Sequence, residues 1–274
     1  DPLGDELELS ALGVGRHRVI VAPVSDTTAL NRATFPVPAS VPYATLSPMT
    51  HTAEQLHALV AACEQFRGSK APDGYRDGLA LCVIDSVQST GVTYSSVENV
   101  VARYRAYRRE RSGDPNRDGV AELLGTVDEL DGPDGWASRI GNSNRTSTRG
   151  GILKSEAIRD AACVLDAAGI RNTDLLRKVA EQDGAQLEQV RKAWCAVTGQ
   201  RSGITWHYML MLAGIEGVKP DRMICRFVAD SLGLPRRSVT PPFAMEILTA
   251  AAKEMGMLPT DLDHGVWQFQ RTRR

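Results

Sequence analysis

Two neighbouring segments decide the fold: Gly199-Gln-Arg-Ser-Gly-Ile-Thr-Trp-His-Tyr-Met-Leu-Met-Leu-Ala-Gly214 and Lys219-Pro-Asp-Arg-Met-Ile-Cys-Arg-Phe-Val228. The first predicts that a helix ends at Gly199 and that a tight hairpin bounded by glycines leads into a second, apolar helix. The second predicts a helix that opens with Pro220 and a single carboxylate, Asp221. Backbone amides at a helix start can hold a phosphate without a charged side chain, so the arrangement indicates contact with DNA. The alternative is that the glycines are ordinary turn residues.

The composition is that of an ordinary globular protein. The chain has 274 residues, of which 42% are apolar and 24% charged, and its formal net charge is −1. It is long enough to bury a core, as one large domain or two compact ones. Because the net charge provides no global attraction to nucleic acid, DNA binding requires a local basic surface. Candidates are Arg103, Arg105, Arg108, Arg109, Arg111 and the terminal Arg271 to Arg274, unless these form a solvated helix face and a frayed tail.

The cysteines argue against a metal centre and against secretion. Five are present, an odd number, and they are far apart and form no Cys-x-x-Cys pair: Cys63, Cys82, Cys163, Cys195 and Cys225. We expect buried free thiols from a reducing compartment, with neither a zinc site nor an iron–sulfur cluster. No run approaches eighteen apolar residues, and the chain start lacks a signal pattern. These features predict a cytoplasmic protein without membrane contact.

Apart from its first part, the chain has the periodicity of helices. Residues 1–50 carry scattered prolines and predict an irregular N-terminal segment. After Thr52, a predicted helix cap, apolar residues recur at helical spacing. The first expected helix begins near Thr52, and another carries the apolar stripe Val97, Val100, Val101 and Tyr104. The others cover about 75–87, 117–131, 133–141, 154–168, 172–182, 185–197, 221–232, 241–256 and 260–270. Strand-like alternation is absent after residue 50, so the predicted fold class is all-α. The polar loop 141–151 is either functional or a mobile connector.

Three segments, in order, carry a family resemblance. The first, Leu79-Ala-Leu-Cys-Val-Ile-Asp-Ser-Val-Gln-Ser-Thr-Gly91, is an apolar helix that ends in a polar turn containing Gln88. The second is the helix start Leu153-Lys-Ser-Glu-Ala-Ile158, and the third is the hairpin followed by Asp221. In this order they resemble the helix–hairpin–helix superfamily of base-excision DNA glycosylases, of which endonuclease III is the best-known member. The resemblance spans about residues 76–233.

The resemblance implies a two-lobed all-α fold and a DNA substrate. A helical barrel lobe, residues 76–215, would end in the hairpin. A second helical lobe would combine residues 51–75 with 216–274, and double-stranded DNA would lie between the lobes. It further implies a nucleoid-associated monomer that hydrolyses the N-glycosidic bond of a damaged or modified base.

The chain departs from the family pattern at the hairpin. The family proline and compact Gly-x-Gly are replaced by Thr198-Gly199-Gln-Arg-Ser-Gly203, which is two residues longer. The lysine that bifunctional members place just after the hairpin is replaced by Thr205 and Trp206, so the expected activity is hydrolysis without strand cleavage. The cysteines of the family's iron–sulfur cluster are absent. No cofactor is expected, with a monovalent cation at the hairpin as the one candidate.

The resemblance assigns the catalytic role to Asp221. Loss of a base develops positive charge on the sugar, which a nearby carboxylate can stabilise, or the carboxylate can activate water. A carboxylate in the first turn of a helix stays ionised because of the helix dipole and the amides. An aspartate beside a proline at a helix start is also a routine cap, and that alternative remains open.

Other residues are assigned to DNA and to the extruded base. By the resemblance, Gln88 would enter the gap left in the DNA stack, unless it only bonds local carbonyls. The expected DNA contacts are Gln88, Gly199, Arg201, Ser202 and Gly203, and the candidate base-pocket residues are Trp206, His207, Tyr208, Tyr94 and Trp136. Consecutive residues 206–208 point in different directions on a helix, so at most two can share a pocket. Two rival functions remain: a catalytically inactive relative that binds DNA lesions, and a helical scaffold that binds protein.

Overall fold

The computed structural model describes residues 51–272, and within this range the chain is all-α. The elements are α1 (Ala53–Cys63), η1 (Glu64–Phe66), α2 (Leu79–Gln88), α3 (Tyr94–Glu110), α4 (Val120–Glu129), α5 (Pro133–Arg139), α6 (Lys154–Ala167), α7 (Thr173–Gln182), α8 (Gly184–Ala196), α9 (Ile204–Leu212), α10 (Arg222–Ser231), η2 (Arg236–Ser238), α11 (Pro241–Glu254) and α12 (Pro259–Thr272). Strands are not found in this range, where an isolated bridge joins Arg145 to Leu153. The predicted fold class is confirmed for the described residues. The segment 1–50 and the last two arginines of the tail lie outside them.

Side-chain caps fix several helix starts. Thr52 closes a capping box with Gln55 at the start of α1, as its sequence predicts. Asn172, Asp183 and Thr240 accept a backbone N–H in the first turns of α7, α8 and α11. Each such bond satisfies an amide that has no partner inside its helix, and is worth about 1 kcal/mol.

Two helices start later than their periodicity predicts. The expected start of α2 near Tyr75 is wrong, because the Tyr75 amide donates to the carbonyl of Leu212, 2.7 Å away, instead of opening the helix. The expected start of α4 near Arg117 is wrong as well, since the Arg117 amide closes a turn on Asp114. In both cases a hydrogen bond outside the helix overrides the local preference.

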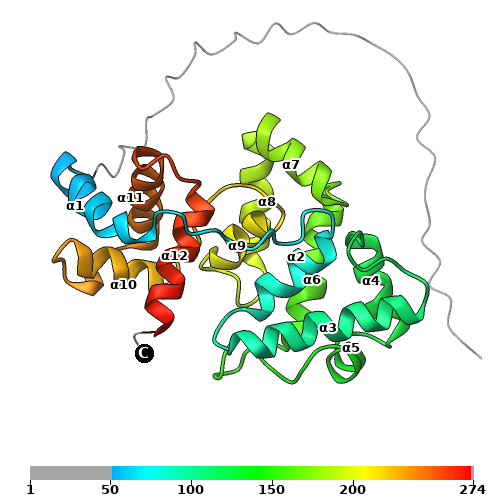
Figure 1. Cartoon of the computed structure of the whole chain (residues 1–274). Helices are drawn as coiled ribbons and strands as arrows, with labels where there is room; N and C mark the ends of the chain where they lie inside the picture. The colour runs from blue at the N-terminus through cyan, green and yellow to red at the C-terminus, as the bar shows by residue number, and fades with distance from the viewer. Residues whose placement is uncertain (1–50, 273–274) are drawn as a thin grey trace, which may run out of the picture. The chain divides into compact units, whose positions relative to one another are not determined.

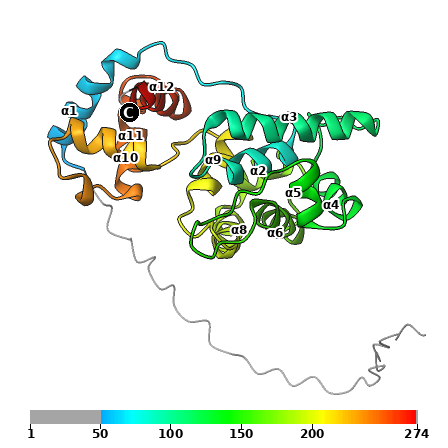
Figure 2. The same cartoon turned by 90° about the horizontal axis from the view of Figure 1, so that it is seen from below.

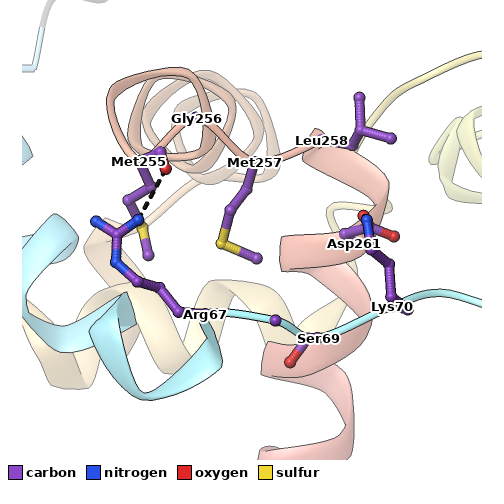
Figure 3. A pocket seen from close by; sticks show the side chains of 9 residues that line it. Arg67, Ser69, Lys70, Met255, Gly256, Met257, Leu258 and Asp261 are labelled. Carbon is purple, nitrogen blue, oxygen red and sulfur yellow. Dashed lines mark hydrogen bonds and ion pairs between the residues drawn. The ribbon is translucent and has the colours of Figure 1, made fainter.

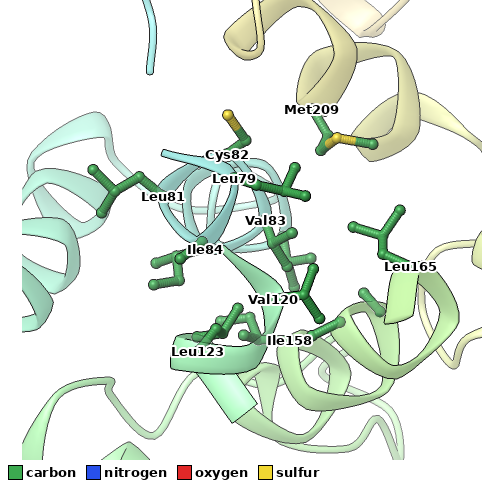
Figure 4. Packing of buried hydrophobic residues seen from close by; sticks show 14 of the residues in the cluster. Leu79, Leu81, Cys82, Val83, Ile84, Val120, Leu123, Ile158, Leu165 and Met209 are labelled. Carbon is green, nitrogen blue, oxygen red and sulfur yellow. The ribbon is translucent and has the colours of Figure 1, made fainter. Parts of the chain in front are cut away.

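The first hydrophobic core is built around α2. Every residue of this helix is buried, and its side chains contact α3, α4, α6 and α9. Figure 4 shows Leu81, Ile84 and Val83 leaving α2 on different sides, with Val120, Leu123, Ile158, Leu165 and Met209 around them. Since burying one such side chain stabilises the fold by about 1.5–3 kcal/mol, α2 is the element that holds this core together.

The second core is made by α1, α10, α11 and α12, which group together in both views of the molecule (Figures 1 and 2). Phe66, Phe227 and Phe269 pack edge to face at its centre, with ring centroids 5.5–6.1 Å apart. This core therefore joins the first described helix to the last three.

The cysteines follow the prediction only in part. All five are free thiols, and Cys63 and Cys82 are buried, but Cys163 is exposed. The buried stripe of α6 consists of Ala157, Ile158, Ala161, Ala162 and Leu165, and residue 163 lies off that stripe. Within residues 51–272, none of the helices combines the length and the apolar content that crossing a membrane requires.

Candidate functional site

The hairpin between α8 and α9 depends on two glycines. Gly199 has φ +88° and Gly203 has φ +71°, a left-handed conformation that other residues adopt at a cost. Gly199 also lacks room for a side chain, because an added Cβ would lie 2.3 Å from the Cβ of Thr146. The polar loop 141–151 is therefore packed against the hairpin.

Just after the hairpin, in the first turn of α9, a buried threonine stands where bifunctional glycosylases carry a lysine. Thr205 is 1% exposed. Its hydroxyl accepts a hydrogen bond from Trp194 Nε1 (3.0 Å) and donates to Gln200 Oε1 (2.6 Å). Trp206 is also buried and packs edge to face on Trp194. A lysine at either position would place an ammonium group in this core.

The expected monovalent cation has few free carbonyls to bind in this turn. The carbonyl oxygens of Val197, Gln200 and Gly203 each accept a backbone amide. Among residues 51–272, no three His, Cys, Asp or Glu side chains converge in a way that could hold a metal ion.

The five candidate base-pocket aromatics do not line one pocket. Trp136 is fully buried in the first core and donates its indole N–H to Thr126, and Trp206 is buried as described. Tyr94 is 42% exposed and packs edge to face on Trp267, with ring centroids 6.1 Å apart. The remaining two, His207 and Tyr208, are partly buried. The two tryptophans are thus core residues.

His207 lines a mainly apolar cavity of about 440 Å³ between α9, the segment 215–218 and α11. Burial lowers the pKa of the His207 imidazole, and Arg191 adds to this effect.

A second depression, of about 410 Å³, lies between the segment 67–70 and residues 255–258 (Figure 3). There Arg67 donates to Glu64 and to the Met255 carbonyl, and Lys70 is paired with Asp261. Both cationic side chains of this depression are therefore already engaged within the protein.

Gln88 is held at the buried end of α2. Its side chain is 1% exposed, with Oε1 3.4 Å from Asn142 Nδ2, and Nε2 has no partner in the described range. The buried ammonium of Lys154 donates to the carbonyls of Gln88 (2.8 Å) and Thr90 (2.6 Å). The expected insertion of Gln88 into a DNA stack would therefore require the side chain to leave this position.

Asp221 is the N-cap of α10. Its Oδ1 accepts hydrogen bonds from the amides of Met223 (2.7 Å) and Ile224 (3.2 Å). Oδ2 has neither a hydrogen-bond nor an ion-pair partner within residues 51–272. The residue is partly buried. One oxygen is thus fixed by the helix start, and the other remains available to a ligand.

A polar group that the sequence analysis did not single out lies next to Asp221. We call it the Lys219 cluster. It consists of Tyr75, Asp85, Ser89, Tyr208, Lys219 and Asp263. Its residues come from both cores and from the segments that connect them.

Lys219 is the centre of this cluster. Its amine lies 3.7 Å from the centroid of the Tyr208 ring and donates to Ser89 Oγ at 3.2 Å, while its backbone amide donates to Asp263 Oδ1 at 2.9 Å. Burial lowers the pKa of the Lys219 amine, against the opposing influence of Asp221 and the carboxylates of the cluster. The amine is therefore deprotonated more easily than an ordinary lysine.

In two carboxyl groups of the cluster, Asp263 and Asp85, burial raises the pKa instead of lowering it. Asp263 is 7% exposed, and burial raises its pKa to about 8, with Asp221 adding to the rise. Asp85 is 3% exposed, and burial raises its pKa although Tyr75 donates a hydrogen bond of 2.8 Å to Oδ2. Clusters of shifted titratable groups are common at functional sites, so this cluster extends the candidate site beyond Asp221.

The arginines divide into bonded and free ones. On α3, Arg103 donates to the carbonyls of Ile140 and Gly141 and Arg108 pairs with Asp118, while Arg111, which follows the helix, pairs with Glu129. These side chains stabilise the fold. Several others form no side-chain hydrogen bond or ion pair in the described range, among them Arg105 and Arg109 of α3, Arg149 of the polar loop, Arg201 of the hairpin and Arg222 beside Asp221. Of the predicted DNA contacts, Gly199, Arg201 and Ser202 are exposed and Gly203 is buried.

Comparison with known proteins gives a family. No curated protein and no solved structure matches the chain. A family model does match it, over residues 57–271, which include both cores, the hairpin, Asp221 and the Lys219 cluster. The chain therefore belongs to the family described as Domain of unknown function (DUF8548).

Proposed function

We propose that the chain is a DNA glycosylase of the helix–hairpin–helix kind, which hydrolyses the N-glycosidic bond of a damaged or modified base in double-stranded DNA. The observation that carries the proposal is the state of Asp221: two backbone amides hold one carboxylate oxygen, and the other oxygen has no partner in the described range. The two amides hold this carboxylate in one orientation at the start of α10.

Such a carboxylate suits the chemistry of base loss. As the bond between C1′ and the base breaks, positive charge develops on the sugar, and a fixed anion stabilises it without reorganising. Because the helix start already orients Asp221, little entropy is lost when substrate binds. The free oxygen can also accept a proton from the attacking water. Water then supplies the oxygen that replaces the base on C1′.

The arrangement of the helices is compatible with this proposal. The hairpin joins α8 to α9, which both belong to the first core, and Asp221 opens α10, a helix of the second core. In the proposed architecture, which resembles that of endonuclease III, residues 76–215 form the barrel lobe and residues 51–75 with 216–274 the second lobe. Double-stranded DNA lies against the hairpin and Asp221.

The proposed DNA contacts are local because the net charge is −1. Arg201 of the hairpin, Arg149 of the loop packed on it and Arg222 beside Asp221 supply free guanidinium groups for phosphates. Extruding a base costs a few kcal/mol, so weakly paired or damaged bases are the favoured substrates. The proposed enzyme is a monomer that requires no cofactor for hydrolysis.

A screen of duplexes with different damaged bases, followed by alkali cleavage, tests the proposal. We expect at least one duplex to be cut after alkali, and Asp221→Asn to abolish base release. Asparagine is as good an N-cap as aspartate, so the variant should keep its stability. Asp183→Asn is the matched control, since Asp183 caps α8 by the same kind of bond (2.8 Å to the Gln186 amide) and should be dispensable for activity.

Three results would argue against this function. Full activity of Asp221→Asn would show that the carboxylate is only a cap. Tight, salt-sensitive binding to abasic duplexes without any product would favour an inactive lesion-binding protein. No DNA affinity even at low salt would favour a protein-binding scaffold.

A further inference from the structure

Four planar side chains from α3 and α12 meet at the surface of the protein. We call them the Trp267 surface, and they are Tyr94 of α3 and His264, Trp267 and Arg271 of α12. The Tyr94 ring packs edge to face on the Trp267 ring, with centroids 6.1 Å apart, and the His264 ring stacks on Trp267 at 5.8 Å. The Arg271 guanidinium lies over the Trp267 ring, 5.2 Å from its centroid. The last three side chains share one face of α12, because positions three and four residues apart are neighbours on a helix.

The Trp267 surface exposes residue types that commonly contribute to a core. Tyr94 is 42% exposed, and Trp267 is the one partly exposed residue among the four tryptophans of the chain. Arg271 is exposed and forms neither a hydrogen bond nor an ion pair within residues 51–272. Aromatic and arginine side chains that stay together at the surface are typical of an interaction site.

Unpaired nucleobases fit this surface. Every base has a flat π face, which stacks on the rings of tyrosine and tryptophan and on the guanidinium plane of arginine. In a duplex these faces are covered by the neighbouring base pairs, so side chains at a protein surface reach them only in a single strand or where a base has left the stack. The stack of His264, Trp267 and Arg271 is one to which further flat rings can add.

Arg271 supplies the positive charge that a nucleic acid strand requires. At an exposed site, a cation–π contact such as that between Arg271 and Trp267 is weak. A base can therefore replace the guanidinium on the Trp267 ring, and Arg271 is then free to bind the adjacent phosphate. Two further arginines, Arg273 and Arg274, follow in the sequence. The charge of this region thus favours a polyanion over a protein partner.

We infer that the Trp267 surface binds single-stranded DNA, with bases stacked on Trp267 and Tyr94 and a backbone phosphate on Arg271. The choice of DNA over RNA rests on the proposed function, whereas the stacking does not, because the bases of both have the same flat faces. This activity goes beyond base removal, which takes place in a duplex and at Asp221. The protein then binds DNA in two forms, paired at the hairpin and unpaired at the Trp267 surface.

Tryptophan fluorescence tests the inference directly, because a base that stacks on an indole quenches its emission. Trp136, Trp194 and Trp206 are buried, so quenching by a ligand in solution reports on Trp267. The unaltered protein is titrated at low salt with an oligothymidylate, which has no secondary structure of its own, with an oligouridylate and with a DNA duplex. We expect the oligothymidylate to quench at the lowest concentration and the duplex to quench little. Trp267→Phe should abolish the quenching.

Substitutions separate the contribution of stacking from that of charge. Tyr94→Ala removes an exposed ring and should weaken the binding of the oligothymidylate by about tenfold. Arg271→Gln should also weaken it and should reduce its salt dependence by about one released counterion. Glu98→Gln should strengthen it, since position 98 is one helical turn from Tyr94 and its carboxylate repels phosphate. Arg117→Gln is the matched control, because Arg117 is also exposed but follows the far end of α3.

Three outcomes would overturn the inference. The first is binding of the oligothymidylate without quenching, and the second is equal quenching by the duplex. The third is the absence of quenching by any of the three nucleic acids, which would leave the Trp267 surface to a protein partner. Quenching by the oligouridylate at a lower concentration than by the oligothymidylate would overturn the choice of DNA.

The test is independent of variant folding and of the glycosylase proposal. Quenching is measured on the unaltered protein, so it remains decisive if Trp267→Phe fails to fold. Base release from a damaged duplex that continues without this quenching would count against the Trp267 surface alone. Quenching by single strands without any base release would support the Trp267 surface and count against the glycosylase proposal alone.

Discussion

Thr146 occupies the space that a side chain at Gly199 would need. The two residues belong to the polar loop 141–151 and to the hairpin, which are more than 50 positions apart in the sequence, and a Cβ on Gly199 would come within 2.3 Å of the Thr146 Cβ. The loop is further ordered by hydrogen bonds from the Thr146 amide to the Ile152 carbonyl and from the Lys154 amide to the Asn144 carbonyl, both 2.9 Å. The loop 141–151 is therefore an ordered segment that packs directly against the hairpin.

Substituting the two hairpin glycines should separate steric overlap from backbone strain. Both have positive φ, so either Gly→Ala change costs about 1–2 kcal/mol of conformational strain. At Gly203 the nearest atom to an added Cβ is Cys195 Sγ at 3.6 Å, an ordinary contact. Gly199→Ala must also displace Thr146 and should lose an additional 1–3 kcal/mol or so. Urea unfolding of both variants measures the difference, and equal losses would contradict the packing of the loop on the hairpin.

The stability of the protein should depend on pH through Asp263. Its pKa is raised from 3.8 to about 8 in the folded protein, so the folded state binds a proton that the unfolded state has lost in between. The contribution of this group to stability is therefore complete below pH 4 and is lost as the pH rises to about 8, by up to about 1 kcal/mol per pH unit.

Asp263→Asn tests this dependence. The amide oxygen can still accept the hydrogen bond of the Lys219 amide, but it carries no charge. We expect the variant to be more stable than the unaltered protein at pH 8 and nearly equal to it at pH 4, as measured by denaturant unfolding at both pH values. A constant difference between the two proteins across this range would show that the carboxyl group titrates normally.

One tryptophan should account for most of the fluorescence that a quencher in solution can reach. Trp136, Trp194 and Trp206 are at most 1% exposed, whereas Trp267 is partly exposed and packs between Tyr94, His264 and Arg271. Trp267→Phe should remove nearly all quenching by acrylamide, and Trp194→Phe should leave it almost unchanged. Strong quenching in Trp267→Phe would indicate that one of the buried indoles becomes accessible to solvent.

The sequence predicts the helices well because their apolar residues recur at the helical period. On α6, Ile158, Ala161, Ala162 and Leu165 follow the spacing that buries one face, and the structure buries all four. Periodicity does not predict where α2 and α4 start, because hydrogen bonds of the Tyr75 and Arg117 amides outside these helices fix the two starts. Helix α9 is apolar on all sides, so periodicity could not tell which of its aromatic residues faces the core.

The candidate site was predictable only where one segment contains it. Asp221 follows Pro220 at a recognisable helix start, and its capping bonds are local. The Lys219 cluster brings together α2, α9, α12 and a connecting segment, a juxtaposition that no local pattern encodes. A signal did exist in Asp85, the single charged residue in the buried run 79–88. An isolated carboxylate in such a run requires partners, and here Tyr75 is one of them.

The second core has a consequence for how the chain matures on the ribosome. The first helix of this core, α1, packs on α11, and a hydrogen bond between His51 and Glu246 joins positions 195 residues apart. Leu59, Cys63 and Phe66 thus leave the exit tunnel long before the surfaces that bury them have been translated. At a synthesis rate of about 5–20 residues per second, these apolar side chains wait on the order of ten seconds or more for their partners. During that interval the nascent chain offers a binding site to chaperones, and the helices around α2 can fold first.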